Sequence, residues 1–205
     1  MENIIVSVKN YLEETYHPVV AFLYGSFATE TVTDISDIDC ICFAERKAFF
    51  HDSSTVDGYI LDCWVYPLNR LNEIELLLHI LPCRVLIDKT GIAEDIIKSI
   101  MKRRAELTIS LGVGEKAQLI GWIKKMLGRS AGDSAEALYR YNWLVHDLPE
   151  LYCKFNTEYY DGPMKTIRRL KDKKEFFDNY MLVLKEKNVE ILTQLYSEIT
   201  GADFK

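Results

Sequence analysis

Two acidic residues stand on alternate positions at the head of an apolar run. Asp37 and Asp39 open the run 37–43, in which acidic and apolar side chains alternate as they do in a half-buried strand. Residues i and i+2 of a strand share a face, so the two carboxylates project together. Neighbouring carboxylates repel each other unless a cation lies between them. Oxygen ligands on a rigid edge suit Mg²⁺, and the pair therefore predicts a magnesium site.

Two further features suit the same chemistry. Asp62 lies in the apolar run 58–66, where an unpartnered carboxylate would be costly to bury. Gly25 and Ser26 follow a buried run, and a turn there offers backbone N–H groups and a hydroxyl to a phosphate oxygen. Each feature alone is more common as a solvated strand end, a satisfied buried acid or a plain turn. Together they predict a site for Mg²⁺ and a nucleotide.

Polar residues of the second half offer weaker candidates. Lys165, Arg168 and Arg169 have the i, i+3, i+4 spacing that places cations side by side on a helix. Such a face is most often simply solvated, and the alternative is that Lys165 reaches a triphosphate. Asp147 and Glu150 lie on polar faces of a second predicted helix, and their carboxylates are further candidates. His17, His51 and His79 have no partner at ligand spacing, so we expect surface or packed residues there.

Hydrophobic periodicity predicts strands and helices in an irregular order in the first half of the chain. The expected helices cover residues 4–16, 68–80 and 93–104. The expected strands cover residues 19–24, 37–43, 56–66 and 84–87.

The second half predicts helices throughout, over residues 115–130, 134–155, 163–171 and 176–200. Pro163 suits a first helical turn, where its missing N–H removes no hydrogen bond. We therefore predict two domains, a catalytic domain of residues 1–108 and a helical substrate-binding domain of residues 109–205. The predicted fold class is α+β, a mixed sheet with flanking helices followed by a C-terminal helical bundle.

The composition of the chain bears on whether it binds nucleic acid or a membrane. The formal net charge is −6, which disfavours nucleic acid because general binding to it rests on cationic contacts with phosphates. We see neither a signal peptide nor an apolar run of the roughly 20 residues that would span a bilayer. A cytoplasmic protein without a membrane partner is expected.

The spacing of Gly25-Ser26, Ser36-Asp37-Ile38-Asp39 and the later Asp62 resembles the nucleotidyltransferase superfamily. This superfamily includes DNA polymerase β, the aminoglycoside and lincosamide nucleotidyltransferases and the minimal nucleotidyltransferases of toxin–antitoxin pairs. The resemblance is close over residues 19–66, although Glu30 stands where the family commonly has glycine. It implies that Asp37, Asp39 and Asp62 bind the metal and carry catalysis, and that Gly25 and Ser26 contact the nucleotide.

The resemblance also implies a reaction. We expect a Mg²⁺-dependent enzyme that moves a nucleoside monophosphate from a nucleoside triphosphate, with ATP favoured, to a hydroxyl of a small molecule such as an aminoglycoside-like antibiotic. The alternatives are a transferase that adenylylates a partner protein and a module that senses nucleotide without catalysis. The general base stays open among Asp62, Asp147 and Glu150, and a homodimer is among the expectations.

Overall fold

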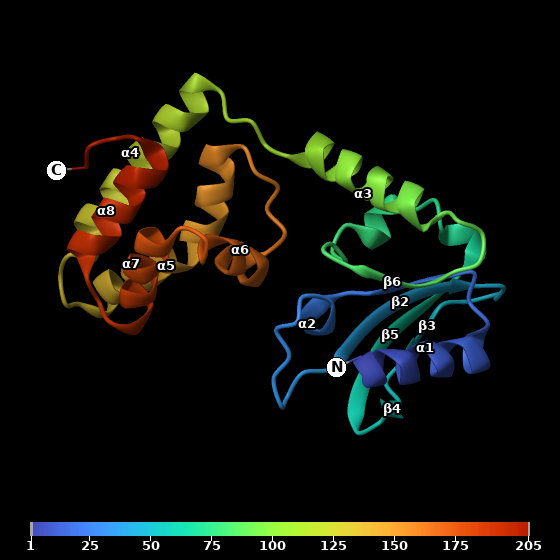
Figure 1. Ribbon diagram of the computed structural model, residues 1–205. Helices are drawn as coiled ribbons and strands as arrows, with labels where there is room; N and C mark the ends of the chain where they lie inside the picture. The colour runs from blue at the N-terminus through green and yellow to red at the C-terminus, as the bar shows by residue number, and fades with distance from the viewer. Residues whose placement is uncertain (1, 205) are drawn as a thin grey trace. The chain divides into compact units, whose positions relative to one another are not determined.

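The computed structural model describes residues 2–204, and the chain divides between Arg104 and Ala105 into two compact units. The sequence-based boundary between residues 108 and 109 lies just C-terminal to this division. The first unit combines a mixed sheet with helices and the second is helical, so the fold class is α+β (Figure 1). No helix within residues 2–204 is long and apolar enough to cross a membrane.

Within residues 2–204, six strands form one mixed sheet in the order β3-β5-β2-β1-β6, with β4 also paired to β5. The strands are β1 (Val20–Leu23), β2 (Ile38–Ala44), β3 (Phe50–Asp52), β4 (Thr55–Val56), β5 (Tyr59–Pro67) and β6 (Arg84–Asp88). The pair β2 and β5 is parallel, whereas β1 pairs with β2 and β6, and β5 pairs with β3 and β4, in antiparallel fashion. Side chains of each strand alternate between the two faces of this sheet.

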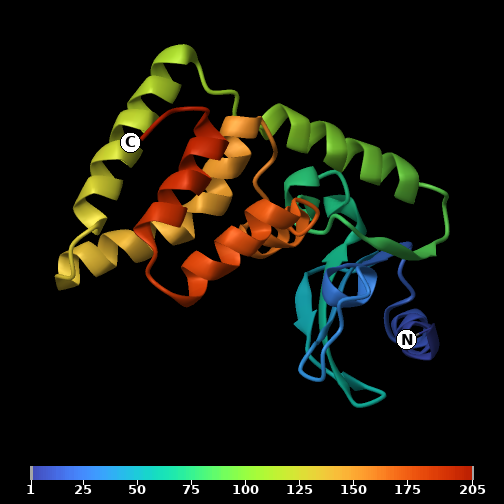
Figure 2. The ribbon, with the colours of Figure 1, turned by 60° about the vertical axis from the view of Figure 1, so that its left-hand side comes forward.

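Helices cover both faces of the sheet (Figures 1 and 2). The helix α1 (Glu2–Tyr16) buries one of its own faces, Ile4, Val8 and Leu12, in the core that contains Cys40 and Cys63. The helix α3 (Ala93–Leu107) buries Ile96 and Ile100 in the core that contains Ile41 and Phe43. These residues recur every four positions, as burial of one helical stripe requires.

The strand predicted over residues 56–66 is wrong at its start, because the chain turns inside it. Asp57 and Gly58 have φ angles of 48° and 87° and separate β4 from β5. An Asp-Gly pair with both φ angles positive makes a two-residue hairpin turn. The sequence pattern also predicts no strand over residues 50–52, where β3 lies.

The helix predicted over residues 68–80 is also wrong. Two short 3₁₀ segments lie there, η1 (Leu68–Arg70) and η2 (Ile74–Leu77). Side chains at i and i+3 eclipse in a 3₁₀ turn. Arg70, the last residue of η1, pairs with Glu73 at 2.7 Å, and Leu77, the last residue of η2, is fully buried, as is Ile80 beyond it.

The helical unit contains α4 (Val113–Ser130), α5 (Ala135–Asn156), α6 (Pro163–Leu170), α7 (Lys174–Lys185) and α8 (Val189–Thr200). The single helix predicted over residues 176–200 is therefore two. Glu186 has extended backbone, and the side chain of Asn188 accepts a hydrogen bond of 3.0 Å from the Ile191 N–H, which caps α8. The buried Tyr141 hydroxyl, on α5, accepts a hydrogen bond of 3.0 Å from the Asn188 N–H. This contact holds the segment between α7 and α8 against α5.

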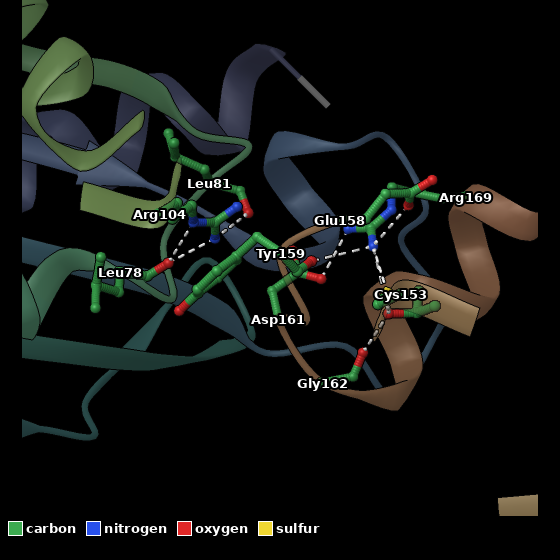
Figure 3. Close-up of polar contacts among 10 residues, drawn as sticks. Leu78, Leu81, Arg104, Cys153, Glu158, Tyr159, Asp161, Gly162 and Arg169 are labelled. Carbon is green, nitrogen blue, oxygen red and sulfur yellow. Dashed lines mark hydrogen bonds and ion pairs between the residues drawn. The ribbon is translucent and has the colours of Figure 1, made fainter. Parts of the chain in front are cut away.

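One cation of the predicted basic face holds the loop before α6. Arg169 Nη1 lies 2.8 Å from Oδ1 of Asp161, whose side chain is 5% exposed, and Arg169 Nη2 lies 3.3 Å from Cys153 Sγ (Figure 3). Arg168, one position earlier, is exposed. Arg169 therefore has a structural role in this unit.

Candidate functional site

Three carboxylates converge at one end of the central strands. Asp37, Asp39 and Asp62 each offer an oxygen atom, and these oxygens all lie within 4.8 Å of one another. Asp39 and Asp62 are half-buried, whereas Asp37 is exposed. The sequence-based cluster of three acids is thus brought together in space.

Strand pairing explains the convergence. Asp39 of β2 and Asp62 of β5 are register partners in the parallel pair. Their strand neighbours Ile38 and Leu61 are buried in the core on the α1 side, so alternation puts both carboxylates on the other face. Asp37 precedes β2 and is not part of it, which corrects the expectation that it lies in the strand.

The Gly-Ser segment lies directly against this cluster. β1 ends at Leu23, and the short helix α2 (Gly25–Ala28) begins at Gly25, whose φ is 67°. A Cβ atom on residue 25 would lie 1.9 Å from Oδ2 of Asp39. Only glycine fits both this conformation and this approach. Ser26 is the next residue of α2 and is half-buried.

The position of Glu30 explains a departure noted in the sequence. Its φ is 58°, in the left-handed region that glycine adopts without strain. Arg84 forms an ion pair with the Glu30 carboxylate, and its Nε donates to the Ala28 carbonyl at 3.2 Å. The contacts of Arg84 stabilise the loop with Glu30 at a positive φ, a conformation that glycine would adopt without strain.

The negative charge of the cluster acts on its neighbours. Burial, followed by the charges of Asp39 and Asp62, raises the pKa of Tyr24. Burial is also the largest cause that raises the pKa of Cys40, and the charges of Cys42, Asp39 and Asp62 add to it. Three carboxylates supply the hard oxygen donors that Mg²⁺ prefers, so this donor set fits a divalent cation.

His51 is the residue of this site that sequence reasoning missed. Its Nε2 atom lies 2.6 Å from Oδ1 of Asp62. β3 pairs with β5 so that His51 is the register partner of Trp64, two positions from Asp62. The missing signal is β3 itself, because three residues are too few for a periodicity.

Residues 5–107 match the family model described as nucleotidyltransferase domain. The chain belongs to this nucleotidyltransferase family. The domain supports transfer of nucleoside monophosphate groups in general, and a family member of this kind is a transferase. The match covers β1, α2, β2 and β5, which carry the Gly-Ser segment and the three acids.

Other comparisons add little to this assignment. Among solved structures, the nucleotidyltransferase is similar to a nucleotidyltransferase-like protein from Exiguobacterium sibiricum 255-15. The two share 9% sequence identity with a TM-score of 0.40, and the match covers 96% of this chain and 74% of that chain. A comparison with curated proteins finds no match.

The remaining sequence-based candidates lie in the helical unit of the nucleotidyltransferase. Lys165 is half-buried on α6. Asp147 and Glu150 lie on α5 and line a cavity of about 320 Å³ together with Trp122 and Lys154. Lys154 pairs with Glu150 at 2.6 Å. Burial raises the pKa of Asp147 above that of an ordinary aspartate, while a hydrogen bond involving Trp143 opposes the shift.

Proposed function

We propose that this nucleotidyltransferase catalyses Mg²⁺-dependent transfer of a nucleoside monophosphate from a nucleoside triphosphate, with ATP favoured, to a hydroxyl of a small molecule. An aminoglycoside-like antibiotic is the acceptor to test first. The observation that carries the proposal is the convergence of Asp37, Asp39 and Asp62 within 4.8 Å in a chain of this family.

In this proposal, Asp37, Asp39 and Asp62 hold the metal. Bound Mg²⁺ would lower the pKa of the acceptor hydroxyl and offset the charge of the triphosphate. Gly25 and Ser26 would contact the phosphates, and the support for this is that the Gly25 backbone lies directly against the Asp39 carboxylate that would hold the metal. The register of β2 and β5 holds the carboxylates of Asp39 and Asp62 in place before substrate binds, which removes an ordering cost from the reaction.

The transfer step is a displacement at the α-phosphorus. The acceptor oxygen forms a bond to this phosphorus, the bond to the bridging oxygen breaks, and pyrophosphate leaves. The hydroxyl proton passes to a carboxylate. We place it on Asp62, which belongs to the cluster, with Asp147 and Glu150 as the alternatives in the helical unit.

The helical unit, in this proposal, binds the acceptor and assists with the nucleotide. In the cavity of about 320 Å³, Lys154 pairs with Glu150, so the carboxylate of Asp147 and the aromatic ring of Trp122 are the groups that would receive a cationic acceptor. Carboxylates beside an aromatic ring attract a cationic group. We assign Lys165 to the phosphates, where a flexible cation offsets negative charge.

The experiment measures transfer of label from α-labelled nucleoside triphosphates with Mg²⁺ into a pool of antibiotics and into cell lysate. Wild type is compared with Asp39→Asn, and the control is Asp34→Asn, which alters an exposed acid outside the cluster. We expect Asp39→Asn to abolish transfer, with an unchanged circular dichroism spectrum, and Asp34→Asn to retain it. Full transfer by Asp39→Asn would remove the role assigned to the cluster.

The labelled product identifies the class of acceptor. Label on a small molecule supports the proposal and names the substrate. Label on a protein band would replace it with the protein-modifying reaction. Nucleotide binding without label that depends on Asp39 would favour a sensing module.

A further inference from the structure

The side chain of His51 is fixed on two sides, although it is 40% exposed. Nε2 lies 2.6 Å from Oδ1 of Asp62, and the imidazole ring lies over the ring of Trp64 with centroids 4.6 Å apart and planes inclined by 32°. Asp62 and Trp64 stand two positions apart on β5 and therefore share a face. One strand thus supplies both the hydrogen-bond partner and the stacking partner.

The ring under His51 is itself held by neighbours. Trp64 lies beside Tyr66 at 6.4 Å, and Phe49 lies against both of these rings at 6.4 and 5.8 Å. These ring contacts restrict where Trp64 can lie, and the ring of Trp64 in turn restricts that of His51. The contact between His51 and Asp62 therefore joins the outer strand β3 to β5.

The chemistry of the two groups sets the direction of the hydrogen bond. An ionised carboxylate only accepts, so Nε2 of His51 donates. This bond engages Oδ1 and restricts rotation of the Asp62 carboxylate, which lies beside those of Asp37 and Asp39. Groups that hydrogen-bond to metal ligands in this way typically change metal affinity or activity by about 10- to 100-fold when they are removed.

We propose that His51 is a positioning residue that orients the Asp62 carboxylate for binding of the divalent cation by Asp37, Asp39 and Asp62. This role rests on the metal site of the proposed function. We assign His51 no contact with the substrate, and its effect on transfer is exerted through the Asp62 carboxylate.

Two variants separate the hydrogen bond from the ring. His51→Phe retains a ring that can lie over Trp64 and removes the donor, whereas His51→Gln retains an N–H donor. For each variant we would titrate Mn²⁺ and follow free Mn²⁺ by electron paramagnetic resonance, with and without the non-hydrolysable nucleotide α,β-methylene-ATP. Transfer kinetics and thermal unfolding of the same full-length proteins complete the set.

We expect His51→Phe to weaken Mn²⁺ binding by about 10- to 100-fold and to lower kcat of transfer by a similar factor, with little change in KM for the acceptor. We expect His51→Gln to stay within about 3-fold of wild type, since a donor remains. Unchanged Mn²⁺ affinity in His51→Phe would overturn the proposal. Equal loss in both variants would also overturn it, because the donor would then be irrelevant.

The two readouts distinguish this proposal from the proposed function. Wild type that binds Mn²⁺ but transfers no label would contradict the transfer reaction, while the Mn²⁺ titrations would still decide the role of His51. Transfer that depends on Asp39 and is insensitive to His51→Phe would leave the function standing and remove the positioning role.

Discussion

Gly25 and Asp39 approach so closely that the backbone of residue 25 packs directly against the Asp39 carboxylate. The space that a Cβ atom would take lies 1.9 Å from Oδ2 of Asp39, and Gly25 has a φ of 67°. The Gly-Ser segment and the acidic pair are therefore one structural unit, although the polar loop 29–36 separates them in the sequence. This contact explains why a glycine precedes Ser26.

Gly25→Ala is expected to lower transfer by about 100-fold, because the added methyl group displaces the Asp39 carboxylate by an ångström or more. The positive φ should in addition lower the free energy of unfolding by about 1–2 kcal/mol. Label transfer and urea denaturation measure the two effects. The control is Gly91→Ala, where φ is 74° and no atom lies within 4 Å of the new Cβ. Equal transfer by both variants would contradict the steric explanation.

Lys165→Ala is expected to weaken binding of the nucleoside triphosphate about 10-fold, as the loss of a charge-assisted hydrogen bond would. Arg168→Ala is the matched control, since Arg168 is an exposed cation of the same helix α6. Titration with a fluorescent nucleotide measures both affinities. Unchanged nucleotide affinity in Lys165→Ala would remove its role at the phosphates.

Arg169→Ala is expected to lower the free energy of unfolding by about 1–3 kcal/mol, because it takes the guanidinium away from the buried carboxylate of Asp161. Arg168→Ala should change stability by less than about 0.5 kcal/mol, as is usual for exposed positions. Chemical denaturation of the two variants tests this difference. An equal effect of the two substitutions would show that the Asp161 contact contributes nothing.

Asp52 should make stability depend on pH. It is 6% exposed and accepts hydrogen bonds from Tyr16 at 2.7 Å and Tyr11 at 3.1 Å, which tie α1 to β3. Burial acts to raise the pKa of Asp52, but its hydrogen bonds with Ser54, Tyr16 and Tyr11 outweigh burial and lower it. The buried Cys63 thiol is its register partner on β5.

A carboxyl group with a lowered pKa in the folded state stabilises the protein above its unfolded pKa of about 3.9 and loses this effect as the pH falls through the folded value. We therefore expect Asp52→Asn to be less stable than wild type at pH 7, and the difference to shrink below about pH 4. Urea denaturation at pH 7, 5, 4 and 3 measures it. A difference that grew on acidification would contradict this account.

Local sequence patterns determined much of this site. The alternation over residues 37–43 predicts a strand with Asp37 and Asp39 on one face, and β2 confirms the strand from Ile38 onward, whereas Asp37 precedes it. Gly25 marks a turn, because a glycine after a buried run indicates a break in the strand. Periodicity also predicts α1 and α3, since burial of one helical stripe repeats every four residues. These inferences succeed because each depends on residues a few positions apart.

Two turn signals are present in the sequence, but each lies inside an apolar pattern that predicts one continuous element. Asp57-Gly58 is a hairpin signal inside the run that predicts one strand. The segment around Asn188 likewise interrupts an apolar helical pattern, and the polar cap there begins a new helix. Hydrophobic periodicity describes which residues are buried, and it does not state where the chain reverses.

Only the tertiary structure decided which side chains meet Asp62. Its contact with Asp39 requires that β2 and β5 run parallel in one particular register, and its hydrogen bond with His51 requires the short strand β3 beside β5. A period of two tells which face a side chain occupies, but not which strand lies alongside or how far it is shifted. Register is set by hydrogen bonds and core packing between distant segments, so the composition of this site is a property of the folded sheet.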